Sequence, residues 1–202
     1  SYGGITAEAT ALTRAAAERY TFAPGTVTGH VLLNLGQANE RHSVIGSEVK
    51  VVDARSVEGR IVTRSFCGGA KYTTWFRIVF DQPVVAHGIW DERGGWPGVD
   101  GPSQQGEAKP HGVWLSFDLG KGPAVTAVSA ISHVDAEGAR INVQAEGMEA
   151  GKPMAFDAMK AKAQQQWQRE LSSVRIEGGS QDDRTVFYTA LYHALLQPMT
   201  GN

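Results

Sequence analysis

The sequence contains one cysteine, almost no excess charge and no long apolar run. A single thiol, Cys67, excludes a disulfide within the chain and does not indicate a cellular compartment. The 19 lysines and arginines nearly balance the 21 aspartates and glutamates, and no cationic cluster is present. Neither nucleic acid nor a membrane surface is therefore an expected partner. Since no apolar stretch reaches the length of a membrane span, no transmembrane segment is expected.

No signal peptide opens the sequence. The first residues, Ser1 to Gly4, are more typical of an internal cut point than of a native start, so this absence does not decide whether the protein is exported. The composition is ordinary for a folded protein, with 42% apolar and 20% charged residues. A chain of 202 residues is long enough for one sizeable core, or for one domain and part of another.

Short runs of alternating apolar and polar residues occupy the first two thirds of the chain. The clearest run, at 113–119, places Val113, Leu115, Phe117 and Leu119 on one face. Similar runs lie at 30–35, 48–52, 60–66, 73–80 and 125–134, and one or two strands are expected within 5–22. Many short strands bounded by glycine and proline are typical of a sandwich, so the sequence predicts a mainly β fold with an antiparallel β-sandwich.

The apolar period changes after residue 155. Apolar side chains then recur every three or four residues, which predicts an amphipathic helix of about four turns. The side chains on its apolar face are Phe156, Met159, Ala163, Trp167 and Leu171. Asp157 lies near the start of this helix, where a carboxylate interacts favourably with the helix dipole.

A second helix is expected after Gly179. Ser180, Asp182 and Asp183 offer capping oxygens at its start, and Pro198 is expected to end it. Its apolar stripe consists of Phe187, Leu191 and Leu195. Because a helix with such a stripe needs a partner surface, we expect either self-association of the chain or burial of this helix against its own sandwich.

The longest stretch without a regular pattern lies at 90–111, and long loops are often functional or mobile. Trp90 and Trp96 suit stacking on the C–H face of a sugar ring, with Asp91 and Glu92 as partners for its hydroxyl groups. These four residues form the candidate substrate-binding set. The alternative is a long hairpin connection whose tryptophans seal the edge of the sandwich.

Other site patterns are missing from the sequence. The six histidines lack the spacing of a metal site, and no carboxylate pair can be placed by local spacing at the separation that glycosidic cleavage needs. No phosphate-binding loop and no nucleophile elbow is found. The histidines are His30, His42, His87, His111, His133 and His193. We therefore assign no catalytic residue and no metal ligand within this sequence.

Four segments occur in a recognisable order. The first contains Glu18-Arg-Tyr-Thr-Phe22, the second runs from Trp75 through an aromatic strand into Phe80-Asp-Gln-Pro83, and the third contains Ile131-Ser-His-Val134. The fourth combines Phe156, Trp167 and the block at 187–198. Together these segments, which span nearly the whole chain, resemble the family 92 glycoside hydrolases, the calcium-dependent exo-acting α-mannosidases.

In such proteins an N-terminal β-sandwich packs against an (α/α)6 barrel that holds most of the active site. The resemblance implies removal of α-linked mannose by inverting hydrolysis, in which an acid protonates the leaving oxygen and a carboxylate activates water. A calcium ion holds sugar hydroxyls in such enzymes. The family's acid, base and calcium ligands lie beyond the position that matches Asn202. The resemblance therefore implies that this chain alone binds no calcium and is inactive.

The resemblance also implies three parts. These are an N-terminally incomplete sandwich at 1–148, a linker with the amphipathic helix at 149–176, and the truncated start of a helical catalytic domain, with its first (α/α)6 helix, at 177–202. The expected partners are an α-mannoside glycan and the remainder of the catalytic domain, and the expected location is periplasmic or secreted. A non-catalytic carbohydrate-binding or structural β-sandwich module is the competing interpretation.

Overall fold

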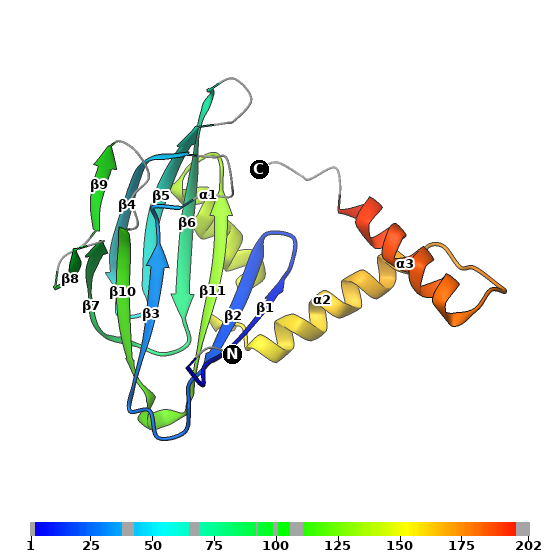
Figure 1. Cartoon of the computed structure of the whole chain (residues 1–202), viewed down its shortest axis with the longest axis horizontal. Coiled ribbons are helices and arrows are strands. Elements are labelled where there is room, and N and C mark those ends of the chain that lie inside the picture. Colours follow the sequence, from blue (N-terminus) through cyan, green and yellow to red (C-terminus); the bar gives the residue numbers. More distant parts are fainter. Residues whose placement is uncertain are drawn as a thin grey trace.

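The computed structural model describes residues 3–37, 43–64, 69–91, 93–98, 101–105 and 111–196. Within this part of the chain, two antiparallel sheets pack into a sandwich and two longer helices extend from it (Figure 1). The predicted fold class is confirmed. Cys67 and Pro198 lie outside the described residues, as do residues 65–66 at the end of one predicted strand.

The larger sheet contains seven described strands. In spatial order they are β1 (Thr6–Ala11), β2 (Ala15–Thr21), β11 (Ala124–Ser132), β6 (Lys71–Phe80), β5 (Ser56–Arg64), β4 (Ser43–Asp53) and β9 (Gly101–Gln105). The smaller sheet contains, in order, β3 (Thr28–Asn34), β10 (His111–Asp118), β7 (Val84–Asp91) and β8 (Gly94–Pro97). A short ribbon of β12 (Met148–Glu149) and β13 (Lys152–Pro153) completes the strands.

The main core lies between the two sheets. Val113, Leu115 and Phe117 of β10 are at most 1% exposed, which confirms the predicted inward face of this strand. From the opposite sheet, Phe80 of β6 meets Phe117 with ring centroids 5.0 Å apart. Side chains that alternate across both strands thus fill one inter-sheet layer.

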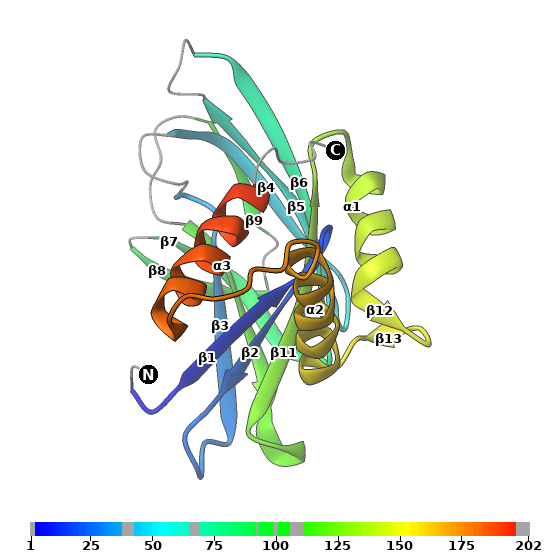
Figure 2. The same ribbon diagram turned by 90° about the vertical axis from the view of Figure 1, so that its right-hand side faces the viewer.

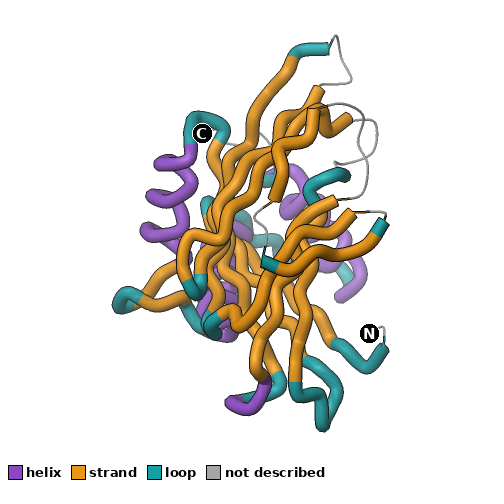
Figure 3. The backbone as a smooth tube through the Cα atoms, turned by 90° about the vertical axis from the view of Figure 1, so that its left-hand side faces the viewer, coloured by secondary structure: helices purple, strands orange, loops and turns teal. Residues whose placement is uncertain are grey.

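Helices cover the outer face of the larger sheet, so the molecule has three layers (Figure 2). They are α1 (Ala136–Asn142), the π-helical turn η2 (Val143–Gly147) and the first turns of α2 (Phe156–Leu171); a 3-10 turn, η1 (Leu119–Lys121), joins β10 to β11. A second apolar cluster fills this layer, with Val128 of β11 and Met159 of α2 both fully buried. Figure 3, which looks from the side of β8 and β9, shows the strands grouped together with helical segments beside them.

Helix α1 was not predicted, although a local signal for it exists. Asp135 caps the helix by accepting a hydrogen bond from the Gly138 backbone N–H at 2.7 Å. Ala139, Asn142 and Val143 then face the sheet at helical spacing and are buried. The run is short and contains a glycine, which weakens its periodic signal.

The interpretation of 90–111 as a continuous irregular stretch was wrong. β7 extends through Asp91 and returns as β8, which forms a tight hairpin with it. β9 then pairs with β4 of the larger sheet, so this segment crosses from one sheet to the other. Glycine and proline in β8 and β9 lower the strand propensity that sequence patterns detect.

The amphipathic helix predicted after residue 155 is confirmed as α2, and the second predicted helix as α3 (Gln181–Leu195). Ser180 and Asp183 form a reciprocal capping box at the start of α3. No residue of α3 is buried; its contacts include the Tyr192 ring, 4.6 Å from the Trp167 ring of α2. Burial of α3 against the sandwich is therefore contradicted, whereas self-association stays a prediction.

Replacement of Ser180 by alanine is expected to loosen the first turn of α3. The Ser180 hydroxyl accepts the Asp183 backbone N–H at 3.1 Å, and losing such a cap costs about 1 kcal/mol. Amide hydrogen exchange in α3 should accelerate about fivefold in Ser180→Ala. The neighbouring substitution Gln181→Ala removes no cap and should leave exchange unchanged. Equal exchange in both variants would show that the capping box does not hold this helix.

Candidate functional site

The structure separates the predicted sugar-binding residues. Trp90 and Asp91 are consecutive on β7, so their side chains point to opposite faces of the smaller sheet. Trp90 is opposite Gly112 on the outer face, and Asp91 is opposite His111 on the inner face. The backbone of Trp96 pairs with Ile89 in the hairpin, whereas its side chain and the whole of Glu92 lie outside the described residues.

Asp91 is engaged by its own turn. Its carboxylate accepts hydrogen bonds from the Arg93 guanidinium and from the Arg93 backbone N–H, both at 2.7 Å. These hydrogen bonds favour the charged form and hold the pKa of the Asp91 carboxyl below its usual range. In this structure Asp91 therefore stabilises the β7–β8 turn.

A buried polar pair joins the two sheets near this turn. Ser47 of β4 and His111 of β10 are each 3% exposed, and the Ser47 Oγ lies 2.5 Å from the His111 Nε2. Their burial keeps both side chains away from any substrate in solution. No local sequence pattern indicates this pair, because its members are 64 residues apart.

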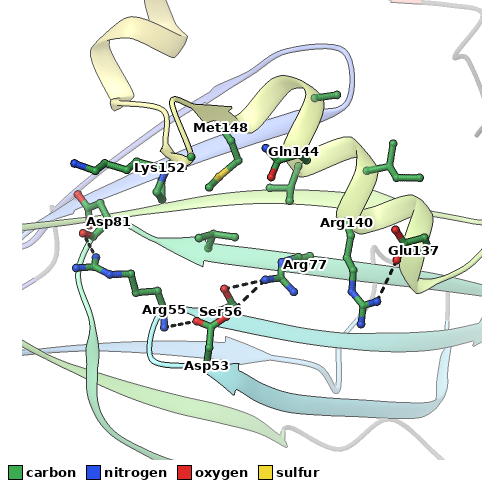
Figure 4. Close-up of a pocket in the computed structure, with 16 residues that line it drawn as sticks. Asp53, Arg55, Ser56, Arg77, Asp81, Glu137, Arg140, Gln144, Met148 and Lys152 are labelled. Atoms are coloured by element: carbon green, nitrogen blue, oxygen red, sulfur yellow. Dashed lines mark hydrogen bonds and ion pairs between the residues drawn. The ribbon is translucent and has the colours of Figure 1, made fainter.

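A groove of about 990 Å³, lined in part by charged side chains, lies between α1, the β12–β13 ribbon and the outer face of the larger sheet. Figure 4 shows charged side chains from both walls reaching into it. They are Asp53, Arg55, Arg77, Asp81, Glu137, Arg140 and Lys152. None of these residues belongs to the set predicted from the sequence.

Glu58 of β5 holds two of the arginine side chains that line this groove. Its carboxylate accepts hydrogen bonds from Arg140 Nε and Nη2 of α1, at 2.7 and 2.9 Å, and from Arg77 of β6. The Arg140 contact, followed by that of Arg77, lowers the pKa of the Glu58 carboxyl despite its burial, and the pKa of Arg140 is raised in turn. The Glu58 side chain is only 15% exposed, so the network braces α1 against the sheet.

A second groove, of about 1020 Å³, is lined by residues of β1, α2, α3 and the segment that joins the two helices. Its lining includes three aromatic side chains, Trp167, Tyr188 and Tyr192, among polar and aliphatic ones. Arg19 of β2 fixes the start of α2 nearby: its guanidinium pairs with Asp157 at 2.9 Å and lies 4.4 Å from the centroid of the Phe156 ring. The start of α2 is therefore attached to the larger sheet, whereas no residue of α3 is buried.

The described residues contain no group of three or more histidine, cysteine, aspartate or glutamate side chains placed to hold a metal ion. Among the helices of the same residues, none is both long and apolar enough to cross a membrane.

Comparison with protein-family models gives two consecutive matches. Residues 2–132 match the glycosyl hydrolase family 92 N-terminal domain, and residues 138–202 match the glycosyl hydrolase family 92 catalytic domain. The sandwich therefore corresponds to the N-terminal domain model of this family, and the segment from α1 onward matches its catalytic-domain model. Because the first match covers more than half of the chain, the protein belongs to glycosyl hydrolase family 92. A search of curated proteins found no match.

Solved structures show the same fold. The family GH92 alpha-mannosidase BT3965 from Bacteroides thetaiotaomicron matches 98% of this chain with a TM-score of 0.80 and 22% identity, over 26% of its own chain. The family GH92 inverting mannosidase BT2199 from the same organism matches 98% at a TM-score of 0.79 and 24% identity, over 25% of its chain. The family GH92 glycosyl hydrolase ccman5 matches 98% at 0.77 and 26% identity, over 25% of its chain. The chain thus spans about a quarter of the length of these structures.

Proposed function

We propose that this chain is part of a glycoside hydrolase that removes α-linked mannose from glycans. The observation that carries the proposal is the pair of consecutive matches to the two domains of one hydrolase family. Among the similar solved structures, BT3965 is described as an alpha-mannosidase and also in complex with mannoimidazole, and BT2199 as an inverting mannosidase. The substrate proposed for the complete protein is therefore an α-mannoside glycan.

The proposed reaction is inverting hydrolysis, in which one carboxylic acid protonates the leaving oxygen and one carboxylate activates water from the opposite face. In the complete enzyme, a calcium ion would hold sugar hydroxyls and stabilise charge on the distorted ring. The described residues offer no cluster that fits such an ion, so no step is assigned to calcium within this chain. We place the protein in the periplasm or outside the cell.

In this proposal the chain supplies the scaffold. The sandwich forms one body, and α2 carries the chain away from it to α3, which has no buried residue of its own. Half-buried Phe187 and Leu191 and exposed Leu195 would pack against further helices of the catalytic domain, as an amphipathic helix requires. The remainder of that domain is accordingly the proposed protein partner.

The isolated 202-residue chain should not release mannose from an α-linked disaccharide in the presence of calcium. The reason is that the acid and the base of the proposed reaction are assigned to sequence outside it. A protein that carries the same chain together with a complete catalytic domain serves as the positive control. Turnover by the isolated chain, proportional to its concentration, would show that the assignment of catalytic groups is wrong.

A further inference from the structure

Two tryptophans lie side by side in register on the outer face of the smaller sheet, among glycines. Trp90 of β7 pairs with Gly112 of β10 on one side and with Gly95 of β8 on the other. Trp114 of β10 pairs with Gly88 of β7 on one side and with Leu32 of β3 on the other. Because directly paired residues share a face, Trp90 has glycine neighbours on both sides and Trp114 has one on the β7 side. Because glycine carries no side chain, these positions provide no support that would hold an indole perpendicular to the sheet.

The two rings lie flat across the strands. A Cβ built on Gly95 would be 3.4 Å from the Trp114 Nε1, although β7 separates β8 from β10. The Trp114 indole therefore reaches over the whole width of β7. A Cβ built on Gly112 would likewise be 3.1 Å from the Trp90 Nε1, so the Trp90 indole extends over β10. Both residues are half-buried, as expected for rings with one face on the sheet.

The surroundings of the rings are almost uncharged and mix apolar with polar side chains. Leu32 of β3, which is 58% exposed, adjoins Trp114. Beside Trp114 the exposed His30 shares a hydrogen bond with Ser116, with 2.8 Å between Nδ1 and Oγ. Among the described outward-facing residues of β3, β10, β7 and β8, the only carboxylate is that of Asp118, which accepts the Gly120 backbone N–H at 2.9 Å. No lysine, arginine or glutamate stands on this described face. Such a face complements an uncharged polar ligand and offers nothing to a phosphate or an acidic peptide.

A purely structural role does not explain both tryptophans. Their side chains point away from the core between the sheets, and in Figure 1 no described helix crosses in front of β10 and β7. The Trp90 indole N–H is buried without a hydrogen-bond partner among the described residues. A tryptophan that seals a protein interior normally satisfies this donor. The position of the Trp90 ring therefore suits stacking on its face rather than hydrogen bonding through its N–H group.

We propose that Trp90 and Trp114 form a binding platform for a neutral glycan. The C–H faces of consecutive hexopyranose rings would stack on the two indoles, and the His30–Ser116 pair would meet ring hydroxyls at one side. Binding here requires no hydrolysis and no residue beyond this chain. Only the choice of a mannose oligosaccharide as ligand rests on the function proposed above.

Indole N–H signals in proton–nitrogen correlation spectra of the 202-residue chain test the platform directly. The probe is an α-linked mannotriose, titrated to about 20 mM because single-platform sugar binding is weak, with dissociation constants of about a millimolar. The signals of Trp90 and Trp114, assigned from Trp→Phe variants, should shift together with one dissociation constant. Those of Trp75 and Trp167, on β6 and α2, should stay in place. Unmoved Trp90 and Trp114 signals, or shifts confined to Trp167, would overturn the proposal.

Variants and a second sugar separate the platform from the choice of ligand. Trp114→Ala should weaken binding by about tenfold or more, whereas Trp75→Phe removes an indole elsewhere and should not change it. His30→Ala tests the contribution of the His30–Ser116 pair and leaves both indole rings intact. This variant therefore remains informative if Trp114→Ala fails to fold. Unchanged affinity for the sugar would show that His30 is not part of the site. Shifts of Trp90 and Trp114 with cellotriose but not with mannotriose would overturn the mannoside assignment, and with it weaken the proposed function, while leaving a sugar platform in place.

Discussion

Phe117→Ala should destabilise the protein by about 3–5 kcal/mol, the cost of removing a large aromatic side chain from a packed core. Phe117 is 0% exposed in β10 and packs against Phe80 of the opposite sheet, with 5.0 Å between the ring centroids and a tilt of 49°. The cavity would open in the layer where the two sheets meet, and close packing leaves the neighbours little freedom to fill it. Urea unfolding of the two proteins, compared by transition midpoint and slope, measures the loss.

The matched control for this experiment is Val134→Ala. Val134 is 68% exposed after the end of β11, so its truncation should change the free energy of unfolding by no more than about 0.5 kcal/mol. If Phe117→Ala cost as little as this control, the main core would not lie between the sheets. The comparison therefore tests the sandwich itself.

Glu58→Gln should cost about 2 kcal/mol near neutral pH, because it leaves the Arg77 side chain, which is 19% exposed, without its closest carboxylate. The substitution keeps the shape of the side chain and removes its charge. Among the described residues, Arg77 Nη2 keeps the Ser56 hydroxyl at 3.1 Å and the more distant Asp53, at 3.7 Å. The loss should appear as weaker attachment of α1, with faster amide exchange in that helix.

The same substitution should flatten the acid dependence of stability. The pKa of Glu58 is lowered in the folded protein from its ordinary value of 4.5, so the folded state binds fewer protons than the unfolded chain. The stabilisation is therefore present above about pH 4.5 and is lost as the pH falls through the lower folded pKa. Wild type and Glu58→Gln should converge in stability as the solution is acidified.

Glu48→Gln is the control for this pH effect. Glu48 of β4 pairs with Arg60 of β5 at 2.5 Å, but both side chains are more than 40% exposed. A surface pair contributes at most about 1 kcal/mol and is screened by salt. If the free energies of unfolding of wild type and Glu58→Gln differed by the same amount from pH 7 down to acidic pH, the role assigned to Glu58 would be contradicted.

Local patterns in the sequence were sufficient for elements whose neighbours are close in the chain or whose faces are cleanly apolar. The alternation in 113–119 predicts which side of β10 is buried, and the helical period after residue 155 predicts α2. The capping residues before α3 were recognisable because Ser180 and Asp183 are only three positions apart. In each case one short segment contains the whole signal.

Features that depend on pairing between distant strands could not be predicted in this way. The Ser47–His111 contact and the bridge from Glu58 to Arg140 join residues 64 and 82 positions apart. Trp114, which faces the same side as Trp90, was visible only as one outward residue of a predicted strand. Its relation to Trp90 follows from the register of β10 with β7, which no local pattern contains.

Product stereochemistry tests the proposed function most directly. A protein carrying this chain with a complete catalytic domain is incubated with an α-mannoside and calcium, and proton NMR follows the anomeric signals from the first minutes. The proposal predicts that β-mannose appears first and mutarotates later, and that a chelator stops its release until calcium is restored. Failure to release mannose, or release of α-mannose as the first product, would contradict inverting α-mannosidase activity.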